Sequence, residues 1–205
     1  MVSSSDTIHR ENLQAKDTMS SRYLFKHYIT YAPSALLNIT PGIQFGYERI
    51  INNEWAILGE IGGLYSLQDD RKGVRVKAEV RDYFKSAPVL YIGAEVVHKY
   101  TTTDIRDWVD AGTFFRLIDY RGTRNLTYAS LKFGCSPSLG KKRRLLLDIG
   151  LSIGGGKYSV DTKGVPEGFV VNEFNDGFFW DNSFRTRSLA VPMAALSIKL
   201  KYGLK

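Results

Sequence analysis

The sequence predicts an all-β fold, and within that class a β-barrel that spans a membrane. Apolar and polar residues alternate over long segments, as in strands with two different faces. These segments exceed the five or six residues usual in soluble proteins, and a tilted strand needs about 9–11 residues to cross a bilayer. The chain of 205 residues has 19 Gly, 12 Tyr and 11 Phe but only 6 Pro, a mixture that favours strands, tight turns and aromatic surfaces.

The stretch GVRVKAEVRDYF, from Gly73 to Phe84, shows the alternation most clearly. Every second residue is small and apolar, and the residues between them carry charges of both signs. The apolar set is Val74, Val76, Ala78 and Val80, and the charged set is Arg75, Lys77, Glu79 and Arg81. A soluble sheet would place the charged face in water and the apolar face on a core. A membrane barrel would place the apolar face in lipid and the charged face in an enclosed lumen.

Eight segments carry this pattern in chain order: 23–37, 42–50, 55–67, 73–84, 89–100, 126–135, 144–158 and 187–204. Pro33 interrupts the first segment, and Asn52-Asn53 predicts a tight hairpin after the second. Segments two and three present the apolar residues Ile43, Phe45, Tyr47, Trp55, Ile57, Ile61, Tyr65 and Leu67 on one face.

The last four segments alternate in the same way. Their apolar faces are formed by Leu90, Ile92, Ala94, Val96, Ala129, Leu131, Phe133, Leu145, Leu147, Ile149, Leu151, Ile153, Ala190, Ala194, Leu196, Ile198, Leu200 and Tyr202. The connections after segments two, four and six are short, whereas long loops are predicted at 101–125 and 160–186. Short turns on one side and long loops on the other are typical of outer-membrane barrels.

If the apolar faces meet lipid, charged residues of both signs fill the interior. An eight-stranded barrel is just wide enough for side chains, and charges shut away from bulk water must pair or draw in water. The sequence therefore predicts an ion-pair network that leaves no continuous pore. Its predicted members are Glu48, Glu60, Arg75, Lys77, Glu79, Arg81, Glu95, Lys132, Asp148 and Lys199. The alternative is that these charges form the solvated face of a soluble barrel or sandwich.

The segment GIQFGYERIINNEWAILGEIGGLYS resembles the second hairpin of small eight-stranded outer-membrane β-barrels. The likeness covers about residues 23–205 and depends on the Tyr-Glu before the turn, the aromatic residue after it and the repeated long hairpins. It is to barrels of Bacteroidota type and to the membrane domain of outer-membrane protein A. The resemblance implies an eight-stranded antiparallel up-and-down transmembrane β-barrel in the outer membrane, with both termini in the periplasm and no enzymatic activity. The chain ends with Tyr202-Gly203-Leu204-Lys205 rather than with the terminal aromatic residue typical of such barrels.

The polar residues 1–21 predict a flexible N-terminal leader, followed by a barrel domain over 22–205. No apolar signal-peptide core is visible, and we interpret the chain as already processed, with its signal peptide removed. The long loop contains a cluster of aromatic residues that predicts a contact surface: Phe169, Phe174, Phe178, Phe179 and Trp180.

Other chemistry has little support in the sequence. The net charge of +7 is spread along the chain, so nucleic acid is not an expected partner. Cys135 is the single cysteine, and His9, His27 and His98 share no metal-ligand spacing, so neither a metal nor another cofactor is predicted.

We therefore expect a non-enzymatic outer-membrane barrel that is a structural or accessory subunit of an outer-membrane protein complex. Its expected partners are membrane lipids and other outer-membrane or periplasmic proteins. Two alternatives remain open, a lipid-modifying hydrolase of the outer membrane and a soluble β-barrel that binds a small ligand.

Overall fold

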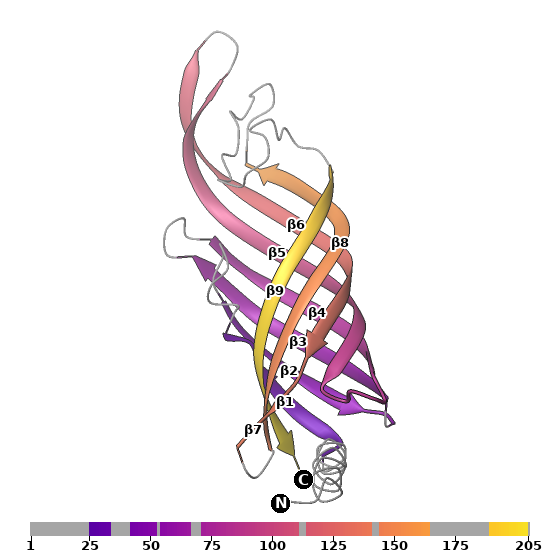
Figure 1. The fold of residues 1–205 in the computed structure, drawn as a ribbon. Helices are drawn as coiled ribbons and strands as arrows, with labels where there is room; N and C mark the ends of the chain where they lie inside the picture. The colour runs from indigo at the N-terminus through magenta and orange to yellow at the C-terminus, as the bar shows by residue number, and fades with distance from the viewer. Residues whose placement is uncertain are drawn as a thin grey trace, which may run out of the picture.

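The computed structural model describes residues 25–33, 42–52, 54–66, 71–110, 114–140, 144–164 and 189–204. The chain folds as an all-β protein, as expected (Figure 1). Its strands are β1 (His27–Tyr31), β2 (Gly42–Ile50), β3 (Trp55–Ser66), β4 (Arg71–Tyr83), β5 (Leu90–Asp110), β6 (Phe115–Cys135), β7 (Ser138–Leu139), β8 (Leu145–Lys163) and β9 (Leu189–Leu204). Among the residues described there is no helix long and apolar enough to cross a membrane.

The eight long strands form one antiparallel sheet that closes into a ring. Each long strand pairs with the next in the chain, β6 pairs with β8, and β9 pairs with β1. The two-residue strand β7 pairs only with the start of β8. Because every edge of the ring is paired, its strands leave no open row of backbone donors and acceptors over their shared length.

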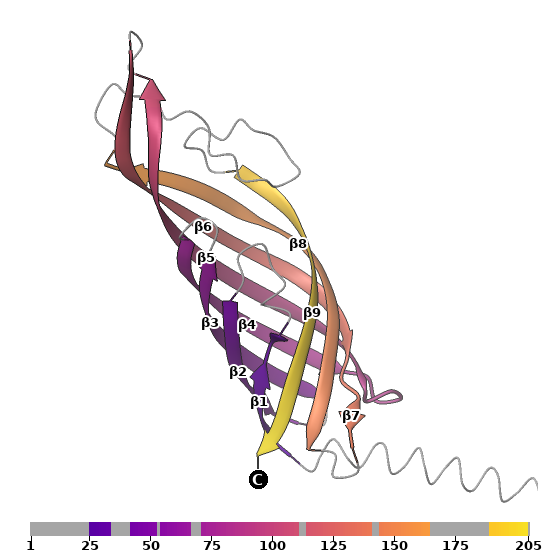
Figure 2. The same ribbon diagram turned by 90° about the vertical axis from the view of Figure 1, so that its left-hand side faces the viewer.

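The ring is strongly staggered. The stagger is measured by following paired residues once around the ring. A row of partners that starts at Tyr31 on β1 ends at Ala190 on β9, whereas the residue of β9 that pairs directly with Tyr31 is Leu200, ten residues further along the strand. The row passes through Phe45, Ile61, Val76, His98, Thr127 and Lys157. A stagger of this size tilts the strands by roughly 40° and, with eight strands, gives an interior that side chains can fill. The tilt is visible in Figure 2.

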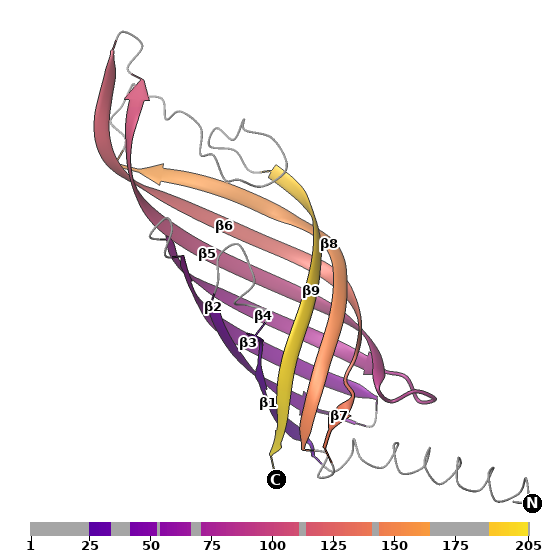
Figure 3. The same ribbon diagram turned by 60° about the vertical axis from the view of Figure 1, so that its left-hand side comes forward.

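The two ends of the ring differ. Strands β1, β3, β5 and β8 start, and strands β2, β4, β6 and β9 end, at one end of the ring, here called the termini end. The opposite ends of these strands lie at the other end of the ring, the loop end. At the loop end β5 and β6 continue past their neighbours, because β4 pairs with β5 only as far as Thr102 and β8 pairs with β6 only as far as Arg121. The rest of this hairpin, residues 103–110 and 115–120, projects as a two-stranded ribbon (Figure 3).

Several predicted boundaries were wrong. The predicted loop at 101–125 contains the upper part of β5 and β6, which reach Asp110 and begin at Phe115. Within the described residues 25–33, the first strand covers His27–Tyr31, and the rest of the predicted segment 23–37 lies outside the described residues. The sequence did not predict the ribbon because its exposed residues include Asp104, Arg106 and Asp119, which break the apolar alternation. The predicted leader 1–21 lies outside the described residues.

Candidate functional site: a charged interior within an apolar outer belt

The side chains of the ring are distributed in the opposite way to those of a soluble protein, with apolar side chains on the outside and charged side chains on the inside. On β4, Val74, Val76 and Val80 point outward and are 48%, 48% and 42% exposed. Their neighbours Glu79 and Arg81 point inward and are 1% and 0% exposed. The alternation in the sequence therefore separates an apolar outer face from a charged inner face.

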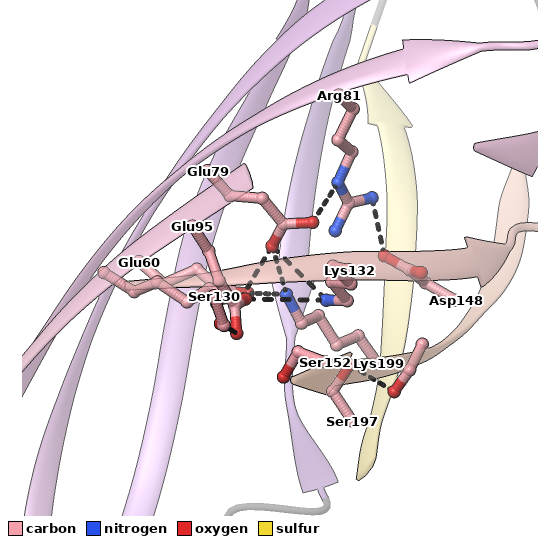
Figure 4. Close-up of polar contacts among 12 residues, drawn as sticks. Glu60, Glu79, Arg81, Glu95, Ser130, Lys132, Asp148, Ser152, Ser197 and Lys199 are labelled. Atoms are coloured by element: carbon pink, nitrogen blue, oxygen red, sulfur yellow. Dashed lines mark hydrogen bonds and ion pairs between the residues drawn. The ribbon is translucent and has the colours of Figure 1, made fainter. Parts of the chain in front are cut away.

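Glu79 is the centre of the buried network (Figure 4). One carboxylate oxygen, Oε1, accepts a hydrogen bond from Nε of Arg81 at 2.7 Å. The other, Oε2, lies 2.8 Å from Nζ of Lys77, 3.3 Å from Nζ of Lys132 and 3.5 Å from Nζ of Lys199. A single carboxylate thus contacts four cations from three strands, β4, β6 and β9, and ties opposite walls of the ring together.

Toward the termini end, Arg81 joins two further carboxylates. Its Nη1 lies 3.2 Å from Glu48 of β2 and 2.7 Å from Asp148 of β8. Lys201 of β9 contacts the same two carboxylates at 2.8 and 3.1 Å. Both carboxylates also accept a hydrogen bond from a buried tyrosine hydroxyl, at 2.8 Å from Tyr83 and 2.6 Å from Tyr91. This layer is held by planar, charge-assisted contacts of the kind that arginine makes best.

Toward the loop end, a second layer surrounds Lys77. Its Nζ lies 2.7 Å from Glu60 and 3.2 Å from Glu95. Lys199 also contacts Glu60 at 2.8 Å, and Lys132 lies 3.9 Å from Glu95. Neutral side chains complete the layer, with hydrogen bonds to these carboxylates from Gln44 at 2.9 Å and from Ser130 at 2.9 Å.

The network is balanced in charge. Its ion pairs join five carboxylates to five cations: Glu48, Glu60, Glu79, Glu95 and Asp148, with Lys77, Arg81, Lys132, Lys199 and Lys201. All ten are buried. We refer to this group as the charge plug. The charges of the plug cancel, and its contacts cross the interior of the ring, for example between Glu79 of β4 and Lys199 of β9.

The predicted network differs from the charge plug at two positions. Arg75 points inward but forms no ion pair with the described residues, and its Nη2 instead donates a hydrogen bond to the hydroxyl of Tyr128 at 3.2 Å. Lys201 takes the fifth cationic place and was not predicted as a member. The sequence did offer a signal for Lys201, because it lies two residues after Lys199 and therefore on the same face of the last segment. Only the stagger between β9 and β2 brings it to Glu48.

The outward residues form a belt with sharp margins. The height of each residue along the ring axis follows from the pairings when the stagger of ten residues is divided equally over the eight strands. By this measure Trp55 and Tyr202 lie at about the same height near the termini end. Tyr65 and Tyr100 share a second height, about ten residues closer to the loop end. All four rings are outward and 38–48% exposed. Between these rows the described outward residues are apolar or glycine, apart from His98 and from Arg49, Asp82 and Thr127 at the margins.

The remaining candidates do not assemble a reactive centre among the described residues. His27 and His98 lie on the outer face, where they contact the hydroxyls of Tyr47 and Thr127. The described residues contain no group of three or more His, Cys, Asp or Glu side chains placed to hold a metal ion. Cys135 is half-buried. The predicted contact residues Phe169, Phe174, Phe178, Phe179 and Trp180, together with His9, lie outside the described residues.

Comparison with known proteins gave no match to a family model, to a curated protein or to a solved structure.

Proposed function

We propose that this chain is an eight-stranded transmembrane β-barrel of the bacterial outer membrane that has no enzymatic role. The observation that carries the proposal is the reversed side-chain distribution, with exposed Ile, Val, Leu and Phe around the whole ring and eleven charged residues buried inside it. A soluble monomer rarely exposes contiguous apolar surface beyond a few hundred Å². A belt that encircles the ring is the surface that hydrocarbon would cover.

The height of the belt supports the same proposal. Ten residues of a strand, at a rise of about 3.3 Å and a tilt of roughly 40°, span about 25 Å along the ring axis. Outer-membrane barrels have an apolar band of about 25 Å flanked by aromatic girdles. The rings of Trp55 and Tyr202 on one side, and of Tyr65 and Tyr100 on the other, are the proposed interfacial anchors.

The charge plug favours a structural or accessory role over transport. A pore needs a continuous aqueous path, whereas the charge plug crosses the ring with ion pairs between 2.7 and 3.9 Å long. At the loop end the β5–β6 ribbon carries exposed charged side chains, with an ion pair of 3.6 Å between Arg106 and Asp119 and, at its base, one of 2.7 Å between Asp104 and Arg121 of the ring. We propose this end, together with the neighbouring connections, as the contact surface for other proteins of the outer membrane.

Depth measurements test the membrane proposal. In a Cys135→Ser background, single cysteines at Ile61 and Leu131 lie near the middle of the belt, and a cysteine at Leu145 lies just below the Trp55 row. A nitroxide at each position is measured in lipid vesicles for its accessibility to oxygen and to a water-soluble nickel complex. The mid-belt labels are expected to favour oxygen, and the label at Leu145 is expected to favour nickel.

Two outcomes would oppose the proposal. Equal nickel accessibility at all three positions would place the belt in water. A monodisperse protein that stays folded without detergent would favour a soluble ring instead. The proposal also expects the folded protein to resist detergent at room temperature and to change its gel mobility after heating.

A further inference from the structure

The outer belt carries three polar side chains next to one another near its margin at the loop end. His98 of β5 pairs with Thr127 of β6, and Thr127 pairs with Lys157 of β8. All three side chains point outward and are exposed, and we refer to them as the polar row. By the height measure, Lys157 is about level with Tyr100, and His98 lies two residues, or about 5 Å along the ring axis, nearer the middle of the belt.

His98 and Thr127 together keep one hydrogen-bond donor to spare. Nδ1 of His98 lies 2.8 Å from Oγ1 of Thr127. If the hydroxyl donates to Nδ1, the neutral ring carries its proton on Nε2, and if Nδ1 donates instead, the hydroxyl proton is left over. In either tautomer one N–H or O–H of this exposed pair still needs an acceptor. A donor without an acceptor is costly in hydrocarbon, so this position favours contact with a polar group of the lipid.

Lys157 adds a positive charge beside this donor. Its paired neighbours are Thr127 on β6 and Ala190 on β9, and the next outward carboxylate of β8, Asp161, is four residues further on, about 13 Å away. Among the residues described, its ammonium group therefore has no carboxylate in contact. A lysine at the border of the hydrocarbon extends its ammonium group toward the lipid headgroups.

The wall directly below the polar row has room for a hydrocarbon chain. Its outward positions there are Ala129 and Gly155, which are paired and exposed. The next pair toward the middle of the belt is Leu131 and Ile153, which are 68% and 66% exposed. A chain that descends from a headgroup at the polar row would first lie close to the backbone and then contact two large apolar side chains.

We propose that the polar row binds the phosphate of an anionic phospholipid headgroup in the leaflet at the loop end. Lys157 supplies the charge and the His98–Thr127 pair supplies a hydrogen bond, a combination that suits a phosphate oxygen. His98 and Lys157 are two strand spacings apart, about 10 Å, a distance that two long side chains can close on one phosphate. The inference rests on the proposed membrane location of the ring and names the kind of lipid held at one place on it.

Fluorescence quenching by brominated lipids tests the site. In a Cys135→Ser background, Leu131→Cys carries a fluorophore below the polar row, and Ile43→Cys carries it on the opposite wall at about the same height. The protein is placed in phosphatidylcholine vesicles in which a small fraction of the lipid, either phosphatidic acid or phosphatidylcholine, has brominated chains. At Leu131, phosphatidic acid is expected to associate at least about fivefold more strongly than phosphatidylcholine, the factor for one lysine near an anionic lipid. No comparable preference is expected at Ile43.

Three variants, measured with the fluorophore at Leu131, assign the preference to residues. Lys157→Gln is expected to lower it about fivefold. His98→Leu places an apolar side chain in the belt and is expected to fold as well as the parent protein, yet to lower the preference at least about twofold. The matched control Lys72→Gln removes an outward lysine at about the same height as Lys157 but three strands away, and it is expected to leave the preference unchanged.

The outcomes separate this inference from the membrane proposal. If both brominated lipids quench the two fluorophores but neither lipid is preferred at Leu131, the ring is in the membrane and the lipid site is refuted. If neither lipid quenches either fluorophore, the belt is not in lipid and both proposals fail. The site is also refuted if Lys72→Gln lowers the preference as much as Lys157→Gln does. Circular dichroism and the heat-dependent gel mobility confirm that each variant compared is folded.

Discussion

Replacing Glu79 with Gln is expected to destabilise the ring more than any other single change in the charge plug. Glu79 is 1% exposed and contacts four cations within 3.5 Å. The substitution keeps the side-chain shape but leaves the plug with five cations and four carboxylates, so a buried positive charge is uncompensated. Breaking a buried ion pair from one side costs about 3–5 kcal/mol, and the number of cations here favours the upper end. Urea titration of the protein in lipid vesicles, followed by tryptophan fluorescence, measures the loss.

Two matched variants show whether the loss arises from the buried charge. Glu54→Gln removes a carboxylate whose partner Lys85 is 79% exposed, and no measurable change is expected. In the double variant Glu79→Gln with Lys132→Met, one charge of each sign is removed, and part of the stability is expected to return. If Glu79→Gln costs no more than Glu54→Gln, or if the double variant loses the sum of both single losses, the neutral plug does not explain the stability of the ring.

Three further predictions concern the belt, the ribbon and the lumen. Arg at Leu151, near the middle of the belt, is expected to cost about 2–4 kcal/mol in vesicles, whereas Arg at Leu145 of the same strand and face is expected to cost about 0–1 kcal/mol, and equal costs would contradict the proposed depth. The hydrogen bond from Arg121 holds the pKa of Asp104 below its ordinary value of 3.8, so the stability that this contact gives the ribbon is present above pH 3.8 and is lost as the pH falls through the lower folded pKa. Arg121→Gln should raise that pKa toward 3.8 in an NMR titration, and an unchanged value would argue against the contact. Planar-bilayer recordings of the intact protein should show no steady ion conductance, and an open channel would refute the predicted absence of a continuous pore.

The alternation in the sequence was sufficient to predict which residues face inward. Neighbouring residues of a strand, such as Val76 and Lys77 of β4, point to opposite faces because the side-chain period is two residues. Placing one of them outside the ring therefore places the other inside. Nine of the ten predicted network residues are in the charge plug for this reason.

The register between distant strands was not accessible from the sequence. Whether Arg75 or Lys201 reaches a carboxylate depends on a stagger of ten residues that accumulates over eight pairings. No pattern within a single segment of the sequence indicates the size of this stagger. The ribbon was missed for a different reason, since the apolar alternation that identifies a lipid-facing strand ends where Asp104 and Arg106 begin, although the backbone pairing continues.

The origin of the plug's cations bears on the order in which the ring assembles. Lys199 and Lys201 both belong to β9, which follows the other strands of the ring in the chain, and they contact Glu60 on β3 and Glu48 on β2. Without β9 the charge plug would hold five carboxylates and only three cations, an excess of two negative charges. Early closure of β8 onto β1 would bury that excess, which is unfavourable. Strand β9 therefore supplies both the backbone pairs that close the ring and the charges that offset the buried carboxylates, so the electrostatics favour a ring that contains β9 over one that lacks it.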